Sequence, residues 1–268
     1  PIRQCNALKG GVVPNGGEGE EDMLGSMQEW PLLCTKVIDH AALLHPNRTV
    51  LTRSVEGPLH TTTYGEIRTR SLQCAKRLEK DGIKYGDRVA TLSWNHHAHL
   101  ECYFGIPAAG GVMHTLNLRL AADEIGWIAA DAKDRFLIVD DILLPLYRQF
   151  AGLHAFEKVI VFPFSGAPVP DGFVDYEALL AGADPDGLQY AAHDERDPTS
   201  MCYTSGTTGR PKGCQLTHSN LLHETRGAAA CFPTLLRQHE RLLVFLPLAH
   251  VLARALSMTA FANKVTLG

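Results

Sequence analysis

The feature that most constrains the fold is an alternation of short apolar strands and helices in the middle of the chain. Segments with strand-like and helix-like spacing follow one another over 88–93, 96–109, 112–115, 121–131, 136–139 and 158–162. Strands separated by helices of this length pair in parallel, because each helical crossover returns the chain to the end of the sheet where the previous strand began. We therefore predict an α/β fold, with largely parallel sheets flanked by helices.

Smaller elements flank this alternation. The apolar spacing over 37–44 predicts a short helix, and the segments 50–52 and 59–62 predict a hairpin. Thr63 and Glu66 have the spacing of a capping box, which marks the start of the next helix. Further along we expect a short helix around Tyr176, strands at 199–203, 214–218 and 241–246, and a helix beginning near Val251.

A ten-residue stretch between two of these strands suits neither a core nor a helix. It reads Thr204-Ser205-Gly206-Thr207-Thr208-Gly209-Arg210-Pro211-Lys212-Gly213. Its glycines allow positive φ and leave backbone N–H groups open to an anion. Its hydroxyls can donate to phosphate oxygens or bind Mg²⁺, and Lys212 adds a mobile positive charge. The stretch predicts a phosphate-binding loop.

Composition alone is equally consistent with a flexible turn that carries a solvated lysine. A Walker loop is excluded, because Pro211 precedes Lys212 and Gly213 follows it where a serine or threonine is needed. No Gly-x-Gly-x-x-Gly opens a helix, so a dinucleotide fold is not supported. The order of the residues therefore has to decide between the two interpretations.

Bulk properties exclude several classes of protein. Of 268 residues, 45% are hydrophobic and 20% are charged, as in globular proteins with a substantial core. The net charge of −4 offers no basic surface to nucleic acid, and no apolar run reaches the ~20 residues of a membrane helix. Seven cysteines without a Cys-x-x-Cys pair, and no secretory signal, favour a cytoplasmic location.

The order Tyr-Thr-Ser-Gly-Thr-Thr-Gly-x-Pro-Lys-Gly resembles the phosphate-binding signature of adenylate-forming (AMP-binding) enzymes, which include acyl-CoA synthetases and luciferases. Tyr64-Gly65-Glu66, Gly86-Asp87-Arg88-Val89-Ala90 and Asn95 extend the resemblance to about residues 24–268. It is closest to the fatty-acyl-CoA synthetases. It implies the first half of their large N-terminal domain over 23–268, truncated at its C-terminal side, after a disordered extension over 1–22.

The resemblance also implies a chemistry: ATP-dependent conversion of a fatty acid to an acyl-adenylate, followed by transfer to coenzyme A. Lys212 would balance charge on the leaving pyrophosphate, and Thr204 would lie near Mg²⁺. His250 would lie where the nucleotide meets the acyl tunnel, although a lone histidine more often caps or packs a helix. Arg254 stands where several such enzymes carry a gating tryptophan, which speaks against that gate. The residues that would wrap the β- and γ-phosphates are Thr204, Ser205, Gly206, Thr207, Thr208 and Gly209.

Three histidines invite a metal hypothesis, since His96 and His99 share a helix face and His97 adjoins them. A zinc site needs three or four converging ligands, and no cysteine or acidic partner stands at suitable spacing. We therefore predict no metal there. The paired acidic residues are expected in turns or solvated loops rather than as an acid–base pair: Asp140, Asp141, Asp184 and Asp186.

Three hypotheses for function remain open. The first is a medium- or long-chain fatty-acid–CoA ligase, the second an adenylating enzyme for another carboxylate or acceptor, and the third a non-catalytic nucleotide-binding fragment. Expected partners are small molecules, with peripheral membrane contact left open for a full-length protein. The chain alone is expected to be inactive. A natural truncation, a fusion of two genes and an incomplete sequence are all consistent with it.

Overall fold

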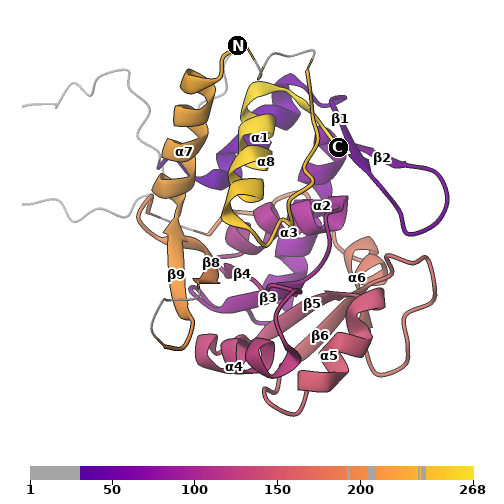
Figure 1. Ribbon diagram of the computed structural model, residues 1–268. Coiled ribbons are helices and arrows are strands. Elements are labelled where there is room, and N and C mark those ends of the chain that lie inside the picture. The colour runs from indigo at the N-terminus through magenta and orange to yellow at the C-terminus, as the bar shows by residue number, and fades with distance from the viewer. Residues whose placement is uncertain (1–30, 192–193, 205–208, 235, 237–239) are drawn as a thin grey trace, which may run out of the picture. The chain divides into compact units, whose positions relative to one another are not determined.

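A central sheet organises the chain, whose computed structural model describes residues 31–191, 194–204, 209–234, 236 and 240–268 (Figure 1). Its strands are β3 (Arg88–Leu92), β4 (Val112–Thr115), β5 (Phe136–Asp140), β6 (Lys158–Phe162), β7 (Val174–Asp175), β8 (Pro198–Thr204) and β9 (Lys212–Thr217). Among the described residues their order is β7-β6-β5-β3-β4-β8-β9. Every neighbouring pair is parallel except the antiparallel pair β8–β9.

Alternate residues of each central strand enter two different apolar cores, one on each face of the sheet. In β5, Phe136 and Ile138 pack into the first core, whereas Leu137 and Val139 pack into the second. Because both faces are buried, these strands have continuous apolar sequences rather than alternating ones. This arrangement confirms the predicted α/β fold with a largely parallel sheet.

Helices cover both faces (Figure 1). The side of the first core holds α1 (Cys34–Leu44), α2 (Tyr64–Lys80), α3 (His97–Ala108), α6 (Tyr176–Ala181), α7 (His218–Cys231) and α8 (Val251–Asn263). The side of the second core holds α4 (Ala122–Ala132) and α5 (Leu144–Phe150), which follows the 3₁₀ turn η1 (Asp141–Leu143). The predicted helices at 37–44, 96–109 and 121–131 are confirmed within three residues at each end, and the helix predicted to begin near Val251 begins at that residue.

A smaller sheet joins the two ends of the described chain. It contains β1 (Thr49–Thr52), β2 (His60–Thr63), β10 (Arg241–Leu242) and β11 (Thr266–Leu267) in the order β10-β11-β1-β2. The antiparallel pair β1–β2 confirms the predicted hairpin. The predicted strand at 241–246 is wrong beyond Leu242, because its partner β11 is only two residues long. Leu243 and Phe245, which follow, are exposed.

The sequence predicts the start of α2 but not that of α7. The predicted capping box of α2 is confirmed: Glu66 N–H donates to Thr63 Oγ1, and Thr63 N–H donates to the Glu66 carboxylate. Helix α7 was not expected, because its box uses Asn220 in place of a glutamate and few of its residues are buried.

The predicted extension over 1–22 lies outside the described residues. In the described part of the chain, no helix has both the length and the apolar character that a membrane crossing requires.

Candidate active site

A cleft of about 370 Å³ lies at the carboxyl ends of β4 and β8. Beyond β4 the chain crosses back to β5, on the other side of β3, so the strand order reverses next to the cleft. Open α/β sheets bind ligands at the carboxyl ends of strands beside such a reversal. The residues that line it include His114, Thr115, Asn117, Tyr203, Thr204, Pro247 and His250.

The predicted phosphate loop leaves the sheet at this cleft. Thr204 ends β8 and lines the cleft, and it pairs across the antiparallel ladder with Lys212, the first residue of β9. Gly209 has φ of +116°, a conformation that L side chains rarely adopt. Ser205, Gly206, Thr207 and Thr208 lie outside the described residues. The register thus places the exposed lysine beside the start of the loop.

The opposite wall of the cleft is the segment that leads into α8. Its last residue, His250, caps that helix by accepting the N–H of Leu252 at Nδ1, 3.2 Å away, and it also lines the cleft. Asn95 holds the same segment in place: its amide donates to the carbonyls of Val244 (2.9 Å) and Leu246 (2.7 Å). Its Oδ1 accepts the N–H of Leu248 at 2.8 Å. The capping role and the site position of His250 are therefore compatible.

Replacing Asn95 by aspartate should destabilise the chain by about 2 kcal/mol or more, because two carbonyls would then face a carboxylate instead of an amide donor. Urea unfolding measures this loss, and Asn47→Asp, at an exposed position, is the matched control. Equal midpoints for Asn95→Asp and the control would contradict the assigned role.

The family model for AMP-binding enzymes matches residues 38–268. The chain belongs to this family. FadD15, a long-chain-fatty-acid–CoA ligase of Mycobacterium tuberculosis, is 39% identical over 83% of the chain and 37% of its own length. A 3-methylmercaptopropionyl-CoA ligase of Ruegeria pomeroyi is 37% identical over 75% of the chain and 38% of its own length. The chain thus spans well under half the length of these relatives.

The fold of this AMP-binding enzyme also matches solved structures. The anthranilate CoA ligase AuaEII, in complex with anthranoyl-AMP, superposes with a TM-score of 0.78 at 21% identity. The match covers 89% of this chain and 45% of that one. At this identity the likeness shows the fold, which agrees with the predicted N-terminal part of an adenylate-forming enzyme.

Next to Thr115, which lines the cleft, the chain carries a buried arginine. The Arg254 side chain on α8 is 1% exposed. Its guanidinium donates to the hydroxyls of Ser200 (2.6 Å) on β8 and Thr115 (3.0 Å) on β4. It also packs 5.1 Å from the ring of Tyr103 on α3. Arg254 therefore ties α8 to the sheet as a buried brace, a position unlike that of a surface gate.

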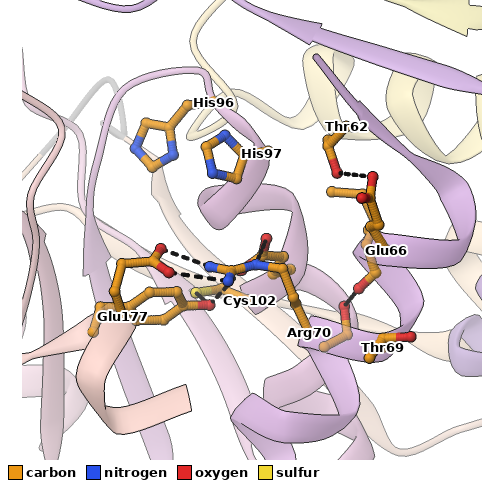
Figure 2. A network of polar contacts seen from close by, with 12 residues as sticks. Thr62, Glu66, Thr69, Arg70, His96, His97, Cys102 and Glu177 are labelled. Carbon is orange, nitrogen blue, oxygen red and sulfur yellow. Dashed lines mark hydrogen bonds and ion pairs between the residues drawn. The ribbon is translucent and has the colours of Figure 1, made fainter. Parts of the chain in front are cut away.

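A second polar network lies away from the cleft and joins α2, α3 and α6. Figure 2 shows Arg70 facing the carboxylate of Glu177, to which it donates two hydrogen bonds of 2.6 and 3.0 Å. Arg70 Nε also donates to Glu101 at 2.6 Å, and Tyr176 donates to the same carboxylate at 2.9 Å. Burial raises the pKa of Glu101, and Arg70 opposes that shift. The network holds the three helices together.

The three histidines at the start of α3, His96 as its N-cap and His97 and His99 within it, have different side-chain partners. His96 Nε2 lies 2.8 Å from Asp140, His99 Nε2 lies 3.1 Å from the hydroxyl of Thr91, and the His97 ring stacks on His60. Burial lowers the pKa of His97 to about 2 and that of His99 to about 3. Within the described ranges, no three or more side chains of the ligating types group together as a metal site would require.

Sequence reasoning missed two groups of this region, His114 and Asp134. They come from β4 and from the turn between α4 and β5, twenty residues apart, and their side chains meet at 2.8 Å. No motif contains both residues, so only the tertiary fold brings them together. A histidine inside the otherwise apolar strand segment 112–115 was the one available signal.

Proposed function

We propose that this AMP-binding enzyme is the nucleotide-binding part of a fatty-acid–CoA ligase, which activates a fatty acid with ATP and transfers the acyl group to coenzyme A. The observation that carries the proposal is the cleft between Thr204 and His250 at the carboxyl edge of the sheet. The loop that follows Thr204 has the composition of a phosphate site. A relative named as a long-chain-fatty-acid–CoA ligase aligns with 83% of the chain. We place the enzyme in the cytoplasm.

In the first step, a carboxylate oxygen would attack the α-phosphorus of ATP. A new O–P bond forms, and the bond to the bridging oxygen breaks with its electron pair on pyrophosphate. Lys212, beside the start of the loop, would balance the charge that gathers there, together with donors from Ser205, Gly206, Thr207, Thr208 and Gly209. The hydroxyl of Thr204 is a hard oxygen of the kind that Mg²⁺ prefers, and a bound ion would neutralise phosphate charge.

Pyrophosphate exchange into ATP tests the proposal. A full-length ligase that includes this chain should catalyse exchange that depends on a medium- or long-chain fatty acid. Exchange with a short thioether or aromatic carboxylate in its place would favour the second candidate, an enzyme for another carboxylate. The similarity to a 3-methylmercaptopropionyl-CoA ligase is the observation that supports this second candidate.

The 268-residue chain alone should form no measurable acyl-CoA. The proposed reaction needs groups held in place around the cleft, and this chain corresponds to only 37% of the length of FadD15. AMP formation with fatty acid, ATP and coenzyme A provides the measurement. A rate clearly above that of a blank without enzyme would contradict the expectation.

A further inference from the structure

A buried histidine in the wall of the cleft has one ring nitrogen that no described residue contacts by a hydrogen bond. His114 on β4 is fully buried and lines the cleft with Tyr203 and Thr204. Its Nδ1 lies 2.9 and 2.8 Å from the two carboxylate oxygens of Asp134. Its Nε2 is buried and has no hydrogen-bond partner among the residues that the structure describes. The first step of the proposed reaction gives this nitrogen no role.

Asp134 determines which ring nitrogen carries the proton. Its buried carboxylate accepts the Nδ1–H, so the neutral imidazole presents a free lone pair at Nε2. The backbone carbonyl of Asp134 in turn lies 2.6 Å from Nε2 of His154, which steadies the turn. An acceptor that is buried without a donor destabilises the folded state. Such an atom in a ligand cleft indicates that the ligand supplies the donor.

The position of His114 relates it to the phosphate loop. It pairs in register with Met201 of the parallel strand β8, so it lies on the same face of the sheet as Met201 and Tyr203. The rings of His114 and Tyr203 are 5.3 Å apart, and the next residue along β8 is Thr204. His114 therefore adjoins the point where the loop begins.

The charged and titratable groups near His114 come from the turn before β5, from α4, from β8 and from the segments that follow β4 and precede α8. Asp134 contacts the ring directly, and Asp131 of α4 accepts the hydroxyl of Tyr203 at 2.6 Å. Burial raises the pKa of Tyr203, which keeps the phenol neutral. His250 and Arg119 line the same cleft. Asp134 is thus the carboxylate that bonds to the ring and orients it.

We propose that His114 is the general base of the thioester-forming step, an inference that rests on the proposed function. A thiol has a pKa near 8.5, so most of it is protonated at neutral pH, although the thiolate is the nucleophile. Nε2 takes the thiol proton while the S–C bond forms at the acyl carbonyl carbon. The C–O bond to the phosphate breaks and its electron pair leaves with AMP. Asp134, a positioning residue, stabilises the imidazolium until it releases the proton to solvent.

His114→Asn in a full-length ligase that includes this chain is the test. The asparagine amide can still donate to Asp134, but it has no counterpart of Nε2. Pyrophosphate exchange, in which the thiol takes no part, should fall far less than the thioester-forming step. Single-turnover thioester formation from acyl-adenylate and coenzyme A should fall by about 10²-fold or more. His40→Asn, at an exposed position on α1, should change neither rate.

Two further readouts separate a base from a structural residue. The slow thioester step of His114→Asn should accelerate about tenfold per pH unit up to the thiol pKa of about 8.5, because only preformed thiolate reacts. The unmodified enzyme should show a flatter profile. Asp134→Asn should move the imidazole proton from Nδ1 to Nε2 in ¹⁵N spectra of the histidines, and should slow the same step by about tenfold or more.

The outcomes are distinguishable. No exchange with any carboxylate in the unmodified enzyme would overturn the proposed function and this inference with it. Exchange together with unchanged thioester formation in His114→Asn would overturn the inference alone. Equal losses in both half-reactions, in both the His114 and Asp134 variants, would assign the pair a structural role and also overturn it.

Discussion

Arg70→Met should destabilise the folded chain by about 3–5 kcal/mol, because it leaves the carboxylate of Glu101 buried without its positive partner. Glu101 is 0% exposed and receives hydrogen bonds from Arg70 and Tyr176. Methionine preserves much of the volume of the arginine stem, so the loss reflects the uncompensated charge rather than a cavity.

The loss should depend on pH in a defined direction. Burial raises the pKa of Glu101 in the folded chain, and removing Arg70, which lowers that pKa, raises it further. A carboxyl with a raised pKa binds its proton more readily in the folded state, so stability falls as pH rises above about 4.3, its unfolded value. The penalty of Arg70→Met should therefore be large at pH 7 and small below about pH 4.

Urea unfolding of the chain across this pH range measures both effects. The double variant Arg70→Met with Glu101→Gln should recover most of the lost stability at pH 7, because no buried charge remains. A penalty below about 1 kcal/mol, or one that does not change with pH, would show that the network contributes little to folding.

Lys212→Ala in a full-length ligase that includes this chain should lower kcat of adenylation by about 10²-fold or more, with a smaller change in KM for the fatty acid. The lysine begins β9 opposite Thr204, where the phosphate loop leaves the sheet. Its charge matters most as pyrophosphate departs, so its loss should affect the transition state more than substrate binding.

Fatty-acid-dependent pyrophosphate exchange at varied substrate concentrations measures kcat and KM separately. Lys80→Ala, at an exposed position at the end of α2, is the matched control and should leave both unchanged. Lys212→Arg should retain part of the rate, because it keeps the charge without the compact ammonium. An unaltered kcat in Lys212→Ala would remove this residue from the proposed site.

Local sequence patterns determined most of the elements. Continuous apolar runs such as 136–139 predicted strands buried on both faces, and Thr63 with Glu66 predicted a helix start that the structure confirms. These signals are local, because burial and capping depend on residues a few positions apart. The run at 241–246 failed for the same reason, since the length of β10 depends on its short partner β11.

The order of residues 203–213 also predicted the family, which the family match confirms, whereas the phosphate-binding role of the loop stays a prediction. Only the tertiary structure decided which polar atoms meet. Arg254 reaches hydroxyls of the adjacent strands β4 and β8, and His114 of β4 meets Asp134 in the turn after α4, because the tertiary fold brings these segments together. Such contacts join residues far apart in the chain, and no local periodicity records them.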